Sequence, residues 1–128
     1  MRKIVSLSTL SMVAAATAML APSVASADAA RGKQLFMRCM ACHTVNKGGA
    51  NRVGPNLAGV VGRKAGAVKN FKYSAAMQKA DLTWDEKTLD KWLARPATVV
   101  PGTSMVFAGL PKPEDRKSLI EYMKAAGK

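Results

Sequence analysis

The chain has 128 residues, with 20 Lys and Arg against 8 Asp and Glu, which gives a formal net charge of +12 at pH 7. A chain of this length forms one small domain, which excludes large multidomain enzymes and allows only a limited apolar core. The positive charge favours acidic partners or anionic surfaces, although the basic residues are scattered rather than gathered in a block.

The N-terminal segment has the pattern of an export signal. Two basic residues precede an uncharged apolar run over residues 4–20, and the Ala-Ser-Ala sequence at 25–27 matches the pattern that signal peptidase cuts. A retained membrane anchor is the alternative, and the run is marginally long for one. We expect cleavage of residues 1–27, which leaves residues 28–128 as one periplasmic domain with 18 basic and 8 acidic residues. An exported protein meets little nucleic acid, so no nucleic-acid partner is expected.

The first predicted helix covers residues 30–41 and has Leu35 and Phe36 at core spacing. Residues 44–70 are rich in Gly, Asn and Lys and predict a long irregular loop. A short helix is predicted over residues 74–80.

The next helix is predicted to begin at a capping box, because Glu86 follows Thr83 by three residues. It is expected to run to about Ala94, where the approach of Pro96 stops it. Its buried side is predicted to carry Leu89, Trp92 and Leu93.

The last helix is predicted to follow a second Pro- and Gly-marked loop over residues 97–112. Pro113 suits the first turn, and the acidic Glu114 and Asp115 oppose the helix dipole. The apolar face of this helix is formed by Leu119, Ile120, Tyr122 and Met123. No strand pattern competes, so the predicted fold class is all-α. Two loops of this length in a small domain argue either against this assignment of elements or for something that organises the loops, and a large flat prosthetic group would do so.

Both cysteines and the only histidine of the chain, Cys39, Cys42 and His43, lie within five residues. A redox dithiol is disfavoured because such a pair usually lies near a βαβ pattern, and none is predicted here. A zinc site would need a fourth ligand, and adjacent Cys and His residues would strain one tetrahedron. Attachment of a c-type haem suits the spacing, since two thiols meet two vinyl groups and the next residue reaches the iron.

The second axial ligand of such an iron cannot be another histidine, which leaves Met, Lys, water or an external ligand. The methionines after the signal are Met37, Met40, Met77, Met105 and Met123. We predict Met105 as the ligand, because its loop, VPGTSMVF, can cover the far face of a haem and a thioether suits haem iron.

Six segments follow one another along the chain: GKQLFMRCMACHTV, VGPNLAGVVGRKAG, FKYSAAM, LTWDEKTLDKWLARP, VPGTSMVFAGL and LIEYMK. They resemble the first helix with its haem anchor, the proline loop, the tyrosine segment, the middle helix, the methionine loop and the last helix of the class I c-type cytochromes. The resemblance covers residues 30–127. It implies a cytochrome c fold, in which three main helices and long loops surround one covalently bound haem c.

By position, the resemblance implies that Cys39 and Cys42 form the thioethers and that His43 and Met105 are the axial ligands. The carbonyl of Pro55 would accept from the His43 ring and fix its tautomer.

The resemblance also implies that Tyr73 and Trp84 hydrogen-bond a buried haem propionate, that Arg63 offsets its charge and that Thr103 steadies the ligand loop. The alternatives are that the two aromatic residues find other partners and that Arg63 is a solvated charge. A close contact between the first and last helices is implied at Gly32, Phe36 and Tyr122.

Several positions depart from the family pattern. Trp92 stands where relatives have Tyr behind the axial Met, and Met77 replaces an Asn that is common near the haem. Ala97 and Ser104 stand where relatives carry Lys, so the basic ring around the haem edge is only partly present. Its expected members are Arg38, Arg52 and Lys112.

The function implied by the resemblance is one-electron transfer by a monomer that is not an enzyme and is not stably inserted in a membrane. Its acidic partners would be a cytochrome bc-type complex as donor and a terminal oxidase, photosynthetic reaction centre or reductase as acceptor. Dedicated service to one periplasmic dehydrogenase is a second interpretation. A third is a small haem peroxidase or ligand sensor, for which the chain lacks a second histidine.

Overall fold

The computed structural model describes residues 16–20 and 24–128. Most of the predicted export signal, residues 1–15 and 21–23, lies outside the described residues. The regular elements of the described part are α1 (Val24–Phe36), α2 (Ala75–Lys79), α3 (Glu86–Ala94), α4 (Pro96–Val99) and α5 (Pro113–Ala126). The β contact between Lys64 and Thr83 is an isolated bridge. The predicted all-α fold class is therefore confirmed.

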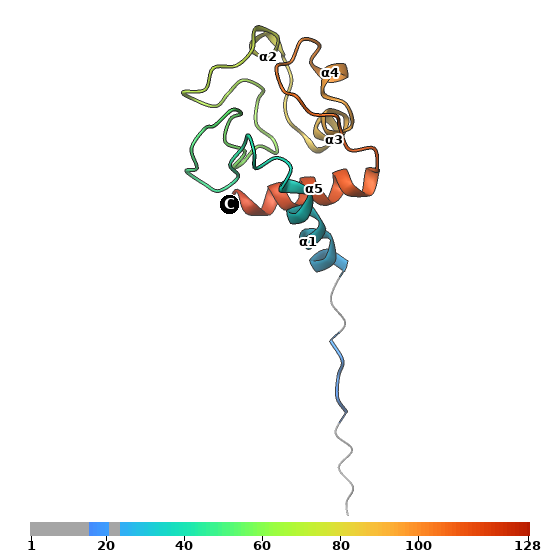
Figure 1. The fold of residues 1–128 in the computed structure, drawn as a ribbon. Coiled ribbons are helices and arrows are strands. Elements are labelled where there is room, and N and C mark those ends of the chain that lie inside the picture. Colours follow the sequence, from blue (N-terminus) through green and yellow to red (C-terminus); the bar gives the residue numbers. More distant parts are fainter. Residues whose placement is uncertain (1–15, 21–23) are drawn as a thin grey trace, which may run out of the picture.

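Helices α1 and α5 cross in close contact at one end of the fold (Figure 1). The approach depends on Gly32, because a Cβ there would overlap the carbonyl oxygen of Ser118 and the Cβ of Tyr122. The rings of Phe36 and Tyr122 pack beside this point, with centroids 5.4 Å apart. The contact that the resemblance implied between the first and last helices is thus present.

The prediction that the first helix continues to residue 41 is wrong. Helix α1 ends at Phe36, and turns follow it over residues 37–42. The amide of Cys39 donates to the carbonyl of Phe36 at 2.8 Å, and the amide of His43 donates to the carbonyl of Cys39 at 2.8 Å. These turns retain spacings of three and four residues, so their side-chain pattern imitates a continuing helix.

The predicted capping box of the middle helix is also wrong, because Asp85 is the N-cap of α3. Its side chain accepts from the amide of Thr88 at 2.7 Å, whereas Thr83 belongs to the isolated bridge. The predicted end at Ala94 is confirmed. Pro96 then opens the short helix α4, so the first residues of the expected loop are helical.

Helix α5 begins at Pro113 as predicted, with two acidic residues in its first turn. Its buried side packs against α1 and α3. The buried residues of α3 and α5 in the apolar core are Leu89, Trp92, Leu93, Leu119, Ile120 and Met123.

Two long segments connect the helices and lie beyond the α1–α5 crossing (Figure 1). The first, residues 37–74, contains the predicted irregular loop and ends at Ser74, whose Oγ accepts from the amide of Met77 at 3.1 Å and caps α2. The second, residues 100–112, joins α4 to α5. Side chains from both segments line one cavity together with residues of α3 and α5.

Candidate cofactor site

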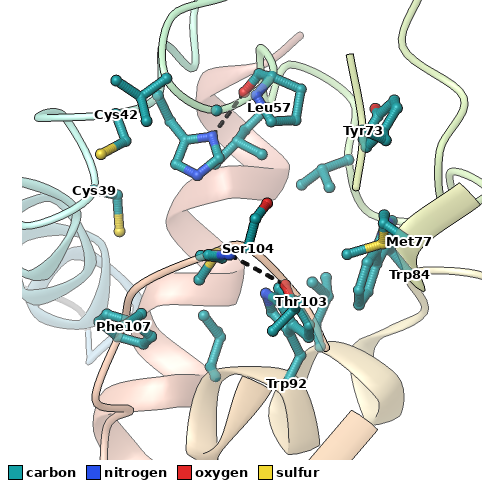
Figure 2. Close-up of a pocket in the computed structure, with 18 of the residues that line it drawn as sticks. Cys39, Cys42, Leu57, Tyr73, Met77, Trp84, Trp92, Thr103, Ser104 and Phe107 are labelled. Carbon is teal, nitrogen blue, oxygen red and sulfur yellow. Dashed lines mark hydrogen bonds between the residues drawn. The ribbon is translucent and has the colours of Figure 1, made fainter. Parts of the chain in front are cut away.

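The cavity has a volume of about 370 Å³ and a mostly apolar wall. This size falls within the range of ligand and cofactor pockets. Figure 2 shows Cys39 and Cys42 on one side of it and Tyr73, Met77 and Trp84 on the other. The nine residues predicted for the haem site are Cys39, Cys42, His43, Pro55, Arg63, Tyr73, Trp84, Thr103 and Met105, and all of them line this cavity.

The two thiols lie at one edge of the cavity and are partly buried and free. Burial, reinforced by the neighbouring Cys42, raises the pKa of Cys39 to about 11. A dithiol that exchanges with disulfides needs an accessible thiolate. The environment of Cys39 therefore disfavours a redox dithiol, while a neutral thiol facing an apolar cavity suits covalent attachment of a cofactor.

The imidazole of His43 is oriented by the segment that follows the thiols. Its Nδ1 lies 2.7 Å from the carbonyl oxygen of Pro55, which can only accept, so Nδ1 carries the proton. Burial lowers the pKa of His43, which keeps the ring neutral. Nε2 consequently retains its lone pair, the form in which an imidazole binds a metal.

A second contact fixes the plane of the ring. A Cβ built on Gly54 would overlap three atoms of the His43 ring, so the backbone at this position lies directly against the imidazole. The amide of Gly54 donates to the carbonyl of Cys42 at 2.8 Å, which joins the two segments. The sequence reasoning did not assign Gly54 a role, although its position next to Pro55 was a usable signal.

Three methionines of the described chain line the cavity: Met77, Met105 and Met123. Met37 and Met40, which were considered as alternatives, are 67% and 53% exposed and do not line it. The sequence argument against these two residues is consistent with their placement.

The segment with Met105 forms one wall of the cavity (Figure 2). The amide of Met105 donates to Oγ1 of Thr103 at 3.2 Å, and the amide of Thr103 donates to the carbonyl of Val100 at 3.1 Å. The hydroxyl of Thr103 therefore restrains the backbone at Met105. Phe107 lines the same wall and was not predicted.

Arg63 is half-buried at the wall of the cavity. Its guanidinium donates to the carbonyls of Ala58 and Asn56, each at 3.0 Å. None of the ion pairs found among the described residues involves it, and desolvation lowers its pKa. A partly desolvated cation beside an apolar cavity favours a bound anionic group.

Two aromatic residues predicted to bind the same anionic group flank this region. The hydroxyl of Tyr73 accepts from the amide of Val68 at 3.1 Å, and its own proton is free to donate. The rings of Trp84 and Trp92 pack with centroids 5.0 Å apart. No buried side-chain nitrogen or oxygen in the described chain lacks a partner. Trp92, which stands where relatives have Tyr, lines the cavity beside Trp84 and adds a second indole to its wall.

The donor set fits a covalently attached haem. Two thiols lie at one edge of the cavity, and one imidazole is available for metal binding. Methionine side chains and the half-buried cation of Arg63 line the rest of an apolar volume. Over the described residues, no three His, Cys, Asp or Glu side chains gather into a metal-binding cluster. None of the helices described has the length and apolarity needed to cross a membrane.

Comparison with known proteins identifies the family. The family model "Cytochrome c" matches residues 29–127. The chain is 57% identical over 98 residues to cytochrome c2 iso-2 of Magnetospirillum molischianum, covering 77% of this chain and 97% of the relative.

Two further proteins agree with this match. Cytochrome c2 of Rhodomicrobium vannielii is 46% identical over 114 residues, covering 89% of this chain and 91% of the relative. The solved structure of cytochrome cH from Methylobacterium extorquens matches with a TM-score of 0.70 and 47% identity, over 76% of this chain and 97% of that one. The chain therefore belongs to the cytochrome c family of small electron carriers with a covalently attached haem c.

Proposed function

We propose that the protein carries single electrons in the periplasm with a haem whose axial ligands are His43 and Met105. The observation that carries this proposal is the state of His43, a neutral, oriented imidazole in the wall of a cavity that the Met105 loop closes on another side. When bound, the haem supplies an iron that alternates between Fe(II) and Fe(III).

The two cysteines would hold the cofactor covalently. Each thiol would add its S–H across one vinyl group of the porphyrin, so one C–S and one C–H bond form at each site. Cys39 and Cys42 lie in the turns after α1, at one edge of the cavity. In the same turns, the amide of His43 donates to the carbonyl of Cys39. Covalent attachment and one axial ligand would thus come from a single rigid segment.

The two axial ligands would differ in how they are held. Pro55 orients His43 through a 2.7 Å hydrogen bond and makes its free nitrogen more basic. Thr103 holds the backbone of Met105. With both axial positions occupied by the protein, substrate binding at the iron would be disfavoured and electron transfer favoured over peroxidase chemistry.

The carboxylates of the haem would meet Arg63, Tyr73 and Trp84. Arg63 brings a half-buried positive charge, and the two aromatic residues bring hydrogen-bond donors on the side of the cavity opposite the cysteines. Neutralising a buried carboxylate in this way would reduce the cost of enclosing it.

The partner would be acidic. Residues 29–80 include 10 Lys and Arg but no Asp or Glu, so the positive charge of the domain is concentrated in this segment. The lining of the cavity includes exposed Val53 and Val106 as well as Arg38. Arg52 donates to the carbonyl of Met40. An apolar centre with basic neighbours suits brief, salt-sensitive docking to an acidic redox protein.

The donor would be the one implied by the resemblance, a cytochrome bc-type complex, and the acceptor a terminal oxidase, photosynthetic reaction centre or reductase. In the second interpretation, one periplasmic dehydrogenase would be the dedicated donor. The exported chain would be cleaved after Ala27, which the mass of the protein purified from the periplasm tests directly. A fragment beginning at Asp28 is expected, and retention of the first 27 residues would contradict it.

The carrier function is tested on the purified holoprotein. A carrier with both axial positions filled is expected to give a reversible one-electron voltammetric wave, and its reduced form is expected not to bind CO rapidly. Rapid CO binding together with peroxidase turnover at neutral pH would instead support a haem enzyme or ligand sensor.

A further inference from the structure

Arg116 of α5 connects three parts of the molecule through one guanidinium. Its Nε donates to Oδ1 of Asp90 on α3 at 2.6 Å. Its Nη1 donates to the carbonyls of Leu110 and Pro111 at 2.8 and 3.1 Å. The side chain of Arg116 is only 11% exposed, so these bonds form in a largely desolvated setting, where charge-assisted hydrogen bonds are strong.

The two carbonyls lie at the C-terminal end of the loop that carries Met105, five and six residues beyond it. The same end is tied to α3 by the amide of Leu110, which donates to the carbonyl of Leu93 at 2.8 Å. Gly109 adopts φ 95° next to this bond, and a Cβ there would overlap the carbonyl oxygen of Ala94. The loop therefore meets α3 at a point where it has little freedom to move.

The middle of the loop has few bonds of its own. Among the backbone–backbone hydrogen bonds outside the helices, none involves residues 104–108, and the amide of Met105 bonds only to Oγ1 of Thr103. Ser104 and Val106 are exposed. The position of Met105 over the cavity therefore depends on the anchors at the two ends of the loop.

We infer that Arg116 and Asp90 act as a latch that holds the Met105 loop closed over the haem, so that Arg116 is a positioning residue for the axial methionine. The inference rests on the proposed role of Met105. Because Asp90 lies on α3, which also contributes Trp92 to the cavity wall, the latch fixes the loop relative to that wall.

The test uses imidazole as an external ligand of the oxidised holoprotein, because imidazole can reach the iron only when Met105 leaves it. Weakening the latch raises the open fraction of the protein and with it the apparent affinity for imidazole. Arg116→Gln is expected to tighten imidazole binding by about tenfold, the effect of losing charge-assisted hydrogen bonds. Asp90→Asn keeps the two bonds from Arg116 to the loop and is expected to have a smaller effect in the same direction.

Arg31→Gln is the matched control. Arg31 forms a two-bond ion pair with Asp115, also on α5, at 2.9 and 3.0 Å, but it joins α5 to α1 and does not contact the loop. This variant is expected to change imidazole affinity less than about twofold, whatever it does to the melting temperature. If Arg116→Gln does not yield holoprotein, Asp90→Asn carries the test alone.

A second background separates failure of the latch from failure of the proposed ligand. In Met105→Ala protein, Arg116→Gln is expected to leave imidazole affinity unchanged, since no methionine remains for the latch to position. An equal increase in both backgrounds, or no increase in either latch variant, would overturn the inference. If Met105→Ala alone left imidazole affinity at the level of the unaltered protein, the proposed ligand itself would be wrong.

Discussion

The cysteine–histidine segment and the methionine loop form two walls of one cavity but are held in different ways. Around the cysteines, every backbone amide over residues 37–43 except that of Ala41 donates a hydrogen bond. The carbonyl of Cys42 also accepts from the amide of Gly54, and the carbonyl of Pro55 accepts from the ring of His43. Around Met105, the bonds lie at the two ends of the loop.

This difference predicts that the two walls differ in how easily they move away from the cofactor. The histidine wall should stay intact in every state that retains the fold, because moving it breaks several hydrogen bonds together. The methionine wall can detach locally, since few bonds oppose its opening. Substitutions in each wall test this difference.

Removing the thiols should have the largest effect. In Cys39→Ser/Cys42→Ser protein, no covalent bond to the haem can form, and we expect no haem on the chain after denaturing electrophoresis. The single variants should each retain one thioether. Met105→Ala is the matched change on the other wall, and it should keep the haem fully attached. A haem-stained band for the double variant would contradict the assignment of the cysteines.

Gly54→Ala should disturb the histidine wall. The added Cβ overlaps the His43 ring, so a cost of about 1–3 kcal/mol in the free energy of unfolding is expected from overpacking, together with a change in the haem absorption spectrum. Gly48→Ala is the control. Gly48 has φ 76°, but apart from its chain neighbours no residue has an atom within 4 Å of its Cβ position. That variant should lose about 1 kcal/mol without changing the spectrum.

Thr103→Val should loosen the methionine wall alone. It removes the acceptor for the amide of Met105 while keeping the shape of the side chain, and a loss of about 1 kcal/mol in local stability is expected. Hydrogen exchange at the amide of Met105 measures this loss. Thr98→Val, on α4, removes the hydrogen bond that Oγ1 of Thr98 donates to the carbonyl of Arg95, and should leave that exchange rate unchanged. Equal rates in both variants would refute the role of Thr103.

Glu86→Gln should have the smallest effect, because it lies away from both walls. Glu86 pairs with Lys124 at 2.6 Å, and the two side chains are 54% and 40% exposed. Such a pair contributes less than about 1 kcal/mol. Thermal unfolding should show a small loss that shrinks further at high salt, with no change at the haem.

Much of the fold followed from local signals. Pro113 with its two acidic neighbours marked the start of α5, and Pro96 marked the end of α3 near Ala94. The absence of a Cβ at Gly32 marked the helix crossing. In each case the residue type restricts the backbone or the packing directly, so its effect does not depend on distant parts of the chain.

The wrong predictions concerned the cap of α3 and the end of α1, where the sequence allowed more than one local structure. Thr83 and Asp85 are both residue types that cap helices. Because Thr83 forms the bridge with Lys64, Asp85 is the residue that caps α3. The turns after Phe36 resembled a helix because their bonds have helical spacing.

The site could be predicted because residues able to bind a haem or a metal, His and Cys, are rare in this chain. With one histidine and two cysteines, the motif had few interpretations, and all nine predicted residues line the cavity. The contact of Gly54 with His43 had a signal in its position next to Pro55. The contacts of Arg116 could not be predicted, since they depend on how segments distant in the sequence meet. Arg116 in particular is an ordinary basic residue until α3 and the loop end are placed beside it.

The central claim is that Met105 binds the iron opposite His43, and the absorption spectrum of the oxidised holoprotein tests it most directly. A methionine–sulfur charge-transfer band is expected in the unaltered protein. The band should persist in Met77→Leu and Met123→Leu, the other two methionines at the cavity, and disappear in Met105→Ala. Its absence from the unaltered protein, or its survival in Met105→Ala, would contradict the account.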